Sequence, residues 1–159
     1  MKFSYKGIII VLSIAFIVSA CGSKKEQGHQ GHTSNGDLQE KTASVEVLPS
    51  FLKGQSEQIR LVYEAAGKAT DILKWIPCYC GCGESARHTS NMNCFVKEVN
   101  QDGSLVWDDH GTRCGVCLQI AAQSIKMKQE GKTLKEIRSY IDKTFEKGYA
   151  KPTDTPMPN

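Results

Sequence analysis

The sequence predicts a mainly α protein of the α+β class: a small helical domain with one β-hairpin and a cysteine-rich centre. Residues 56–67, 117–131 and 134–148 place apolar side chains at steps of three and four, which is the spacing of one helix face. Residues 95–99 and 105–107 are rich in β-branched and aromatic side chains and flank an Asn-Gln-Asp-Gly turn, typical of a hairpin. Six of the seven cysteines lie between these elements or at their ends.

Capping residues indicate where two of the helices begin or end. Ser56 can accept a hydrogen bond from an amide at the start of the first helix, and Gly67 can end that helix. Thr133 and Glu136 have the spacing of a capping box before the last helix. In that helix Leu134, Ile137, Tyr140, Ile141 and Phe145 are expected to face the core.

The N-terminus has the layout of a bacterial lipoprotein signal. Lys2 and Lys6 precede an apolar run at 8–18, which is shorter than the roughly 18–20 residues that a membrane span needs. Small residues then lead directly to Cys21, which resembles a lipobox. The pattern predicts a signal peptide at residues 1–20 and lipid, such as palmitate, on Cys21, anchoring the chain at the extracytoplasmic face of the cell membrane. A transmembrane anchor and an ordinary secretory signal are the alternatives.

Composition divides the rest of the chain into three parts. Residues 21–44 contain almost no apolar side chains and are expected to form a flexible tether. Residues 45–149 contain the helices, the hairpin and the cysteines, and are expected to form the folded domain. Residues 150–159 are rich in proline and are expected to be disordered. The apolar core is thin for this length, so a cross-link or a metal is expected to stabilise the domain.

Charge and motif content argue against several functions. The formal net charge is +3, and the lysines near the C-terminus alternate with acidic residues, so a nucleic-acid partner is not expected. Asp108, Asp109 and His110 are adjacent polar residues in a loop and do not make a hydrolase constellation. No glycine loop of the phosphate-binding kind is present. The protein is therefore not expected to be an enzyme.

Three disulfides are one interpretation of the cysteines, because an even number outside the cytosol usually forms a disulfide framework. A disulfide within a Cys-x-Cys unit would be strained, so each cysteine of the 78–82 triplet would need a partner elsewhere. Such pairing would be crowded. The residues concerned are Cys78, Cys80, Cys82, Cys94, Cys114 and Cys117.

A metal centre explains the same residues with less strain. Alternation places the side chains of the 78–82 triplet on one side of an extended segment, and the glycines allow the backbone to curl around one centre. Cys114 and Cys117 form a Cys-x-x-Cys unit near a helix start, where the helix dipole favours thiolate, the metal-binding form. The predicted ligands are these five cysteines, with Cys94, His88 and His110 as further ligands or supporting groups.

Thiolate ligands select Cu(I), Zn(II) or iron–sulfur clusters. Six thiols and two imidazoles exceed the four ligands of one tetrahedral zinc ion, which allows two ions, or one ion and one disulfide. An iron–sulfur cluster ranks below copper and zinc because such clusters are less usual outside the cell. The spacing does not separate copper from zinc.

Three stretches carry a resemblance to a known family. The sequences PCYCGCG at 77–83, RHTSNMNCF at 87–95 and WDDHGTRCGVC at 107–117 resemble the PCYCGC-motif lipoproteins of Bacillus-like bacteria. The similarity continues from about Gln58 to the C-terminus. The resemblance implies a shared cysteine arrangement and a surface-lipoprotein setting, and it implies no activity.

Three functions follow from the residues. The first is a membrane-tethered buffer or chaperone for copper or zinc, which exchanges metal with a donor or acceptor protein. The second is a thiol–disulfide oxidoreductase that uses Cys114 and Cys117, although the alternating strands and helices of a thioredoxin fold are missing. The third is an interaction module in which disulfides or zinc only stabilise the fold.

Overall fold

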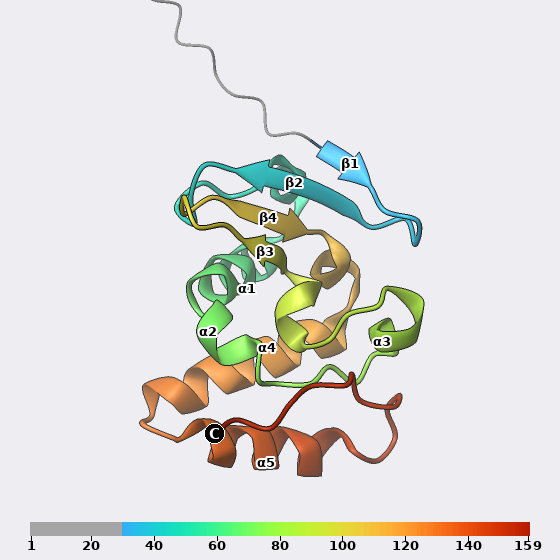
Figure 1. The fold of residues 1–159 in the computed structure, drawn as a ribbon, viewed down its shortest axis with the longest axis vertical. Helices are drawn as coiled ribbons and strands as arrows, with labels where there is room; N and C mark the ends of the chain where they lie inside the picture. Colours follow the sequence, from blue (N-terminus) through green and yellow to red (C-terminus); the bar gives the residue numbers. More distant parts are fainter. Residues whose placement is uncertain (1–29) are drawn as a thin grey trace, which may run out of the picture.

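The computed structural model describes residues 30–159, in which a small antiparallel sheet lies on one side of the helices (Figure 1). The expected signal peptide at 1–20 and the lipidated Cys21 lie outside the described residues. The fold is mixed α+β with helix predominating, as the sequence predicts. None of the helices in residues 30–159 has the length and apolar character needed to cross a membrane.

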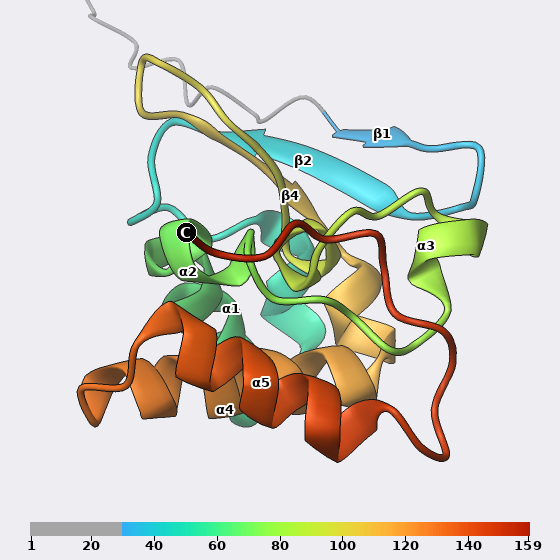
Figure 2. The same ribbon diagram turned by 60° about the horizontal axis from the view of Figure 1, so that its bottom comes forward.

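The α-helices also lie on one side of the sheet in the turned view (Figure 2). Helix α4 contacts both α1 on the sheet side and α5 on the far side. The α-helices are α1 (Glu57–Lys68), α2 (Thr70–Leu73), α3 (Cys82–Ser85), α4 (Gly115–Gln129) and α5 (Leu134–Phe145). Three 3-10 turns complete the helical elements: η1 (Ser50–Gly54), η2 (Asn91–Cys94) and η3 (His110–Arg113).

The sheet has four strands in the order β1-β2-β4-β3. The strands are β1 (Gln30–His32), β2 (Leu38–Thr42), β3 (Val96–Val99) and β4 (Leu105–Asp108). The hairpin predicted from the sequence is confirmed as β3 and β4, with a register shift between Val96 and Glu98. Strands β1 and β2 were not predicted.

The expectation of a flexible tether through residue 44 is wrong for β2. This strand pairs with β4 over four residues, from Gln39 opposite Asp108 to Thr42 opposite Leu105. Its side chains are held by polar contacts, which composition does not reveal. The Trp107 indole N–H donates to Thr42 Oγ1 at 2.8 Å, and the buried Glu40 carboxylate accepts from a backbone amide at 2.8 Å.

The C-terminal segment is also ordered, contrary to expectation. Its backbone runs beside the Cys78–Tyr79 segment, as both ribbon views show (Figures 1 and 2). The amide of Thr153 donates to the carbonyl of Cys78 at 2.9 Å, and the amide of Cys78 donates to Thr153 Oγ1 at 2.9 Å. The guanidinium of Arg138 donates to the carbonyls of Thr155 and Pro156, each at 3.1 Å. Hydrogen bonds that involve the backbone hold this segment against residues 78–79 and α5.

The predicted caps are largely confirmed. Ser56 Oγ accepts from the amide of Ile59 at the start of α1, and Thr133 and Glu136 form the capping box of α5. On α5 the side chains Ile137, Ile141 and Phe145 are buried, as expected, whereas Tyr140 is exposed. Gly67 does not end α1, which continues to Lys68.

Close packing against Trp107 explains why residue 67 of α1 is a glycine. A Cβ atom at this position would lie 2.4 Å from the ring of the buried Trp107. Glycine inside a helix costs roughly 0.5–1 kcal/mol relative to alanine. The close approach of α1 to the β4 tryptophan therefore requires a residue that helix propensity disfavours.

We predict that Gly67→Ala lowers the free energy of unfolding by about 1–3 kcal/mol, because overpacking of the Trp107 ring outweighs the gain in helix propensity. Urea denaturation of the full-length chain measures this change. Gly115→Ala is the matched control: Gly115 is also helical, and a Cβ there meets no atom within 4 Å. Equal midpoints for Gly67→Ala and the unsubstituted chain would contradict the packing explanation.

Candidate metal centre

Two segments that are far apart in the sequence bring their sulfur atoms together. Cys117 Sγ lies 3.3 Å from Cys78 Sγ and 3.4 Å from Cys80 Sγ. Cys114 Sγ lies 2.8 Å from Cys117 Sγ. The expected convergence of the 78–82 segment with the helix that begins near residue 114 is confirmed. All six cysteines of the described chain are free.

The conformation of the PCYCGC stretch determines where its sulfurs point. Cys78 and Cys80 are neighbours, with their sulfurs 3.4 Å apart. The chain then turns at Gly81, whose φ of 88° is accessible mainly to glycine, and Cys82 becomes the first residue of α3. Cys82 consequently points to Cys94, with 3.8 Å between the sulfurs. The glycine turn thus divides the triplet between two sides of the cluster, and the expectation that its three side chains lie on one side of an extended segment is wrong for Cys82.

The Cys-x-x-Cys unit lies at the start of α4, as predicted. Cys114 is the N-cap residue, and its sulfur accepts a hydrogen bond from the amide of Cys117 at 3.4 Å. Because the first amides of a helix lack partners within the helix, a sulfur in this position is held toward the helix end. Cys117, one turn into the helix, is buried and occupies the middle of the cluster.

His88 and Cys94 form the deepest side of the cluster. Both are buried, and His88 Nδ1 lies 3.5 Å from Cys94 Sγ. Burial raises the pKa of the Cys94 thiol well above its usual value. Burial, together with the neighbouring His110 ring, lowers the pKa of His88 to about 4. At neutral pH His88 is therefore an uncharged imidazole, which is the metal-binding form.

His110 connects the cluster to the sheet side of the molecule. Its Nε2 atom lies 3.7 Å from Cys80 Sγ, and its Nδ1 atom lies 3.2 Å from Asp37 Oδ2. Hydrogen bonds to the sulfurs of Cys114 and Cys80, with the attraction of Asp37, raise the pKa of His110 to about 11 despite its burial. A carboxylate that holds one imidazole nitrogen while the other faces a ligand site is a common arrangement around metals.

Asp37 is the functional residue that the sequence interpretation missed. It is buried, and it pairs with Arg113 as well as with His110. It reaches the site because β1 and β2 form a hairpin whose turn contains Gly36 at a φ of 87°. The Asn35-Gly36 pair is a hairpin-turn signal that could have predicted this ordering, had the polar composition around it not suggested a tether.

The pKa values of the clustered thiols are shifted in opposite directions. Hydrogen bonding from Cys117 lowers the pKa of Cys78 to about 4, and contacts with Cys114 and Cys117 lower the pKa of Cys80. Hydrogen bonding to Cys114, and then to the 78–80 sulfurs, raises the pKa of Cys117. The lowered pKa values favour the thiolate form of Cys78 and Cys80. Thiolate is the form that binds metal, so these two sulfurs are prepared as ligands.

Three sets of four donors are close enough to share an ion, because the ligand atoms of each set lie within 4.8 Å of one another. A tetrahedral zinc ion with thiolate ligands places its sulfurs about 3.8 Å apart, so these sets match the size of such a site. The sets are Cys78, Cys80, Cys94 and Cys117; Cys80, Cys82, Cys94 and His110; and Cys80, His110, Cys114 and Cys117. Together they contain every predicted ligand except His88, which contacts Cys94.

A neighbouring group of oxygen and nitrogen donors is explained by hydrogen bonds within the protein rather than by a metal ion. Asp37, His88 and Asp108 also place ligand atoms within 4.8 Å of one another. The Asp108 carboxylate already accepts from Gln39 Nε2 at 2.9 Å and from the amide of His110 at 3.0 Å. These carboxylates therefore have protein partners, and they position His110 beside the thiols.

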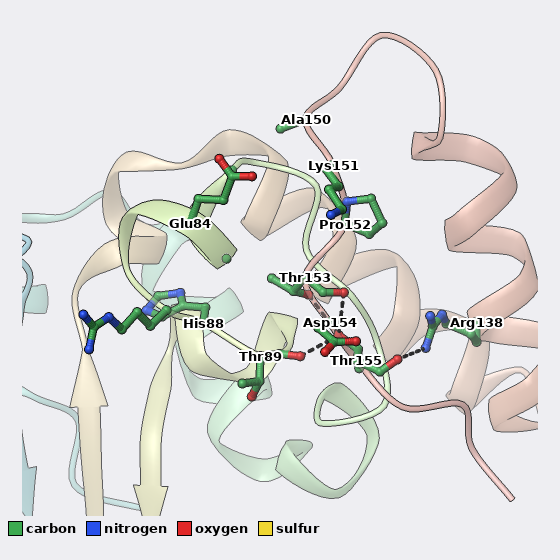
Figure 3. A pocket seen from close by; sticks show the side chains of 13 residues that line it. Glu84, His88, Thr89, Arg138, Ala150, Lys151, Pro152, Thr153, Asp154 and Thr155 are labelled. Carbon is green, nitrogen blue, oxygen red and sulfur yellow. Dashed lines mark hydrogen bonds between the residues drawn. The ribbon is translucent and has the colours of Figure 1, made fainter.

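The cluster has a buried part and a solvent-accessible rim, which is formed by Cys80 and Cys114. Cys80 and Cys114 are partly exposed, whereas Cys78, Cys82, Cys94 and Cys117 are buried. On another side, a cavity of about 820 Å³ separates α3 and the loop after it from the C-terminal segment (Figure 3). His88 is among the residues that line it. Solvent thus approaches the centre at the two rim thiols, and the cavity borders His88.

Comparison with known proteins identifies the motif. The family model described as "Protein of unknown function with PCYCGC motif" matches residues 10–158. The chain belongs to this family. Among the curated proteins and among the solved structures, no match to the chain was found.

The match extends the resemblance noted from the sequence, which begins near Gln58, to most of the chain. In structural terms, the PCYCGC stretch supplies three of the six sulfurs of the cluster. The glycine between its second and third cysteines is the turn that separates their directions. The motif is therefore one wall of the centre, and the start of α4 is the other.

We predict a pH dependence of stability that arises from His88. Between pH 6.5 and about 4 the imidazole takes up a proton in the unfolded chain but not in the folded chain, whose His88 pKa is about 4. The unfolding free energy should therefore fall as the pH is lowered through this window, by at most about 1.4 kcal/mol per pH unit from this residue.

Urea denaturation of the reduced, metal-free protein at several pH values checks this prediction. The quantity of interest is the difference in unfolding free energy between the unsubstituted chain and His88→Gln, because carboxylates that titrate in the same window contribute to both. His32→Gln is the control, since His32 is exposed in β1. A difference that does not change between pH 6.5 and 4 would show that His88 is not held in its neutral form by burial.

Proposed function

We propose that this protein binds a soft metal ion, zinc or copper(I), through its clustered cysteines and acts as a metal buffer or chaperone. The single observation that supports this most strongly is the convergence of the PCYCGC sulfurs with those of Cys114 and Cys117. Sulfur and imidazole donors suit zinc and copper(I) and disfavour magnesium and calcium. The proposed ligands are the six cysteines and His110, with His88 beside Cys94.

Exchange of the metal, rather than a purely structural role, is favoured by the position of the rim thiols. A structural zinc site is closed by four protein ligands. In this cluster Cys80 and Cys114 are partly exposed while donors remain behind them in the core. An incoming thiol of a donor or acceptor protein can replace a rim ligand while the buried ligands keep the ion, so that transfer proceeds one thiolate at a time.

The proposed setting is the extracytoplasmic face of the cell membrane. It is supported by the basic, apolar and small-residue pattern that precedes Cys21, and the proposed anchor is lipid on that cysteine. Such a protein would collect or deliver ions at the membrane surface. Mass spectrometry of the mature N-terminus tests this part of the proposal, and an unmodified Cys21 would contradict it.

We predict that the reduced full-length chain binds Zn(II) and Cu(I), and that Cys80→Ser weakens binding at least about tenfold, because Cys80 belongs to every four-donor set described. Competition with a chromophoric chelator measures the affinity, and free-thiol counting verifies reduction. Cys21→Ser is the matched control, since it makes the same change outside the six clustered cysteines. Equal affinities for Cys80→Ser and the control would count against the proposal.

We further predict that Asp37→Asn weakens metal binding by roughly 10- to 100-fold, the effect expected when the group that orients a histidine ligand is lost. The reason is the contact of 3.2 Å between Asp37 Oδ2 and His110 Nδ1. The same chelator competition measures the loss, and Asp71→Asn, a change on the exposed side of α2, is the control. An affinity within twofold of the unsubstituted chain would show that His110 does not depend on Asp37.

One observation favours a second candidate, a thiol–disulfide oxidoreductase. The sulfurs of Cys114 and Cys117 are 2.8 Å apart at the start of α4, and Cys114 is partly exposed. In this reaction both thiols would lose their protons and two electrons to a substrate disulfide, which would leave as two thiols while Cys114 and Cys117 form a disulfide. An insulin-reduction assay on metal-free protein, with Cys114→Ser as the inactive variant, separates the candidates. Absence of turnover in the unsubstituted chain eliminates the second one.

A further inference from the structure

We propose that the centre holds two metal ions that share the thiolate of Cys80. This inference rests on the proposed metal-binding function and concerns the number of ions and how they are connected. The donors are more numerous than one ion can use: six sulfurs and two imidazoles form one continuous set of contacts, whereas a tetrahedral ion takes four ligands.

The first ion is assigned to the α4 side. Cys80, Cys114, Cys117 and His110 place their ligand atoms within 4.8 Å of one another. This set contains the accessible rim, because Cys80 and Cys114 are its partly exposed cysteines. His110 can supply only Nε2, since its Nδ1 is held by Asp37. The imidazole therefore serves one ion and does not bridge.

The second ion is assigned to the deep side. Cys80, Cys82 and Cys94 belong, with His110, to a second set with ligand atoms within 4.8 Å of one another. Because His110 is assigned to the first ion, this side needs another donor. Cys78 supplies a fourth sulfur, because it shares a further set with Cys80 and Cys94. His88 lies behind these sulfurs, with its Nδ1 atom 3.5 Å from Cys94. This side is buried apart from Cys80.

The turn at Gly81 explains why two ions fit better than one. It sends Cys82 toward Cys94 and leaves Cys78 and Cys80 beside Cys117, so the outer members of the cluster face different centres. Cys82 and Cys114 do not occur together in any of the described donor sets: Cys82 shares its set with Cys80, Cys94 and His110, and Cys114 shares its set with Cys80, Cys117 and His110. Cys80 occurs in both of these sets, and a thiolate sulfur has enough lone pairs to bind two ions.

A single ion would leave buried donors without a cation. If it occupied the α4 side, the thiols of Cys82 and Cys94 would stay in the core with each other and His88 as partners and with no cation. If it occupied the deep side, Cys114 would remain a partly exposed free thiol, 2.8 Å from the buried sulfur of Cys117. Two ions give every one of the six sulfurs a metal partner.

Cadmium(II) is the probe, because it binds the same thiolate sites and has a spin-½ isotope. The full-length chain carrying Cys21→Ser is reduced and titrated with ¹¹³Cd(II), so that thiols outside the cluster do not contribute. Native mass spectrometry is expected to show two ions per chain. Cadmium NMR is expected to show two resonances that are split by coupling through the shared sulfur.

Cysteine variants show which side of the cluster holds each of the two ions. Cys114→Ser and Cys82→Ser are each expected to lose one of the two ions, and a different resonance in each case. Cys80→Ser should remove the splitting, whether or not ions still bind. Ser85→Ala, an exposed change on α3, is the control that should keep both ions and the splitting. Circular dichroism of each variant establishes that it is folded. If the variants unfold, the splitting measured in the unsubstituted cluster still shows whether the two ions share a sulfur.

The outcomes separate this inference from the proposed function. One ion per chain at saturation, or two resonances without splitting, overturns the shared-thiolate arrangement while leaving metal binding intact. Absence of any bound cadmium in the reduced protein overturns both. Two coupled resonances support both.

Discussion

The contact between the PCYCGC segment and the first turns of α4 is the constraint on which the rest of the site depends. Cys117 Sγ lies within 3.4 Å of both Cys78 Sγ and Cys80 Sγ, so the PCYCGC segment and a helix end meet at sulfur atoms. Sulfur is large and weakly polar, and it can be buried in the core as an apolar group. The same atoms are strong metal ligands once their protons are lost. One set of contacts therefore serves both packing and chemistry.

Two chain segments with little apolar character complete the surroundings of this contact. On one side the C-terminal segment bonds to Cys78 through Thr153, and on the other the β1–β2 hairpin brings Asp37 to His110. Each is held by backbone pairing and by polar side chains with partners. Buried polar groups are stable only when their hydrogen bonds are made, which explains why the Thr and Asp side chains of these segments are buried and bonded.

The electrostatics of the centre favour occupation by a cation. The pKa of Cys78 is lowered to about 4, and that of Cys80 is lowered as well, so both side chains favour the negatively charged thiolate. In the metal-free centre the imidazolium of His110, whose pKa is raised to about 11, compensates part of this charge, and metal binding at its Nε2 atom would displace a proton. A metal ion that replaces thiol protons would neutralise more of it. In the proposed two-ion arrangement, the accessible ion exchanges and the deep ion stabilises the core.

The sequence by itself determined helices α1, α4 and α5 and the β3–β4 hairpin. Those features arise from local periodicity, from capping at Ser56 and Thr133 and from the turn residues of the hairpin, which are all readable over a few residues. The meeting of the two cysteine segments, whose residues Cys78 and Cys117 are 39 positions apart, was expected from the chemistry of thiol ligands. Only the tertiary structure decided that Asp37 supports His110, that Thr153 covers Cys78, and that Cys82 turns away to Cys94. These contacts join residues far apart or depend on one backbone turn, and they use polar groups whose partners composition does not reveal. Apolar periodicity therefore predicted the core, while the surroundings of the centre depended on long-range hydrogen bonds.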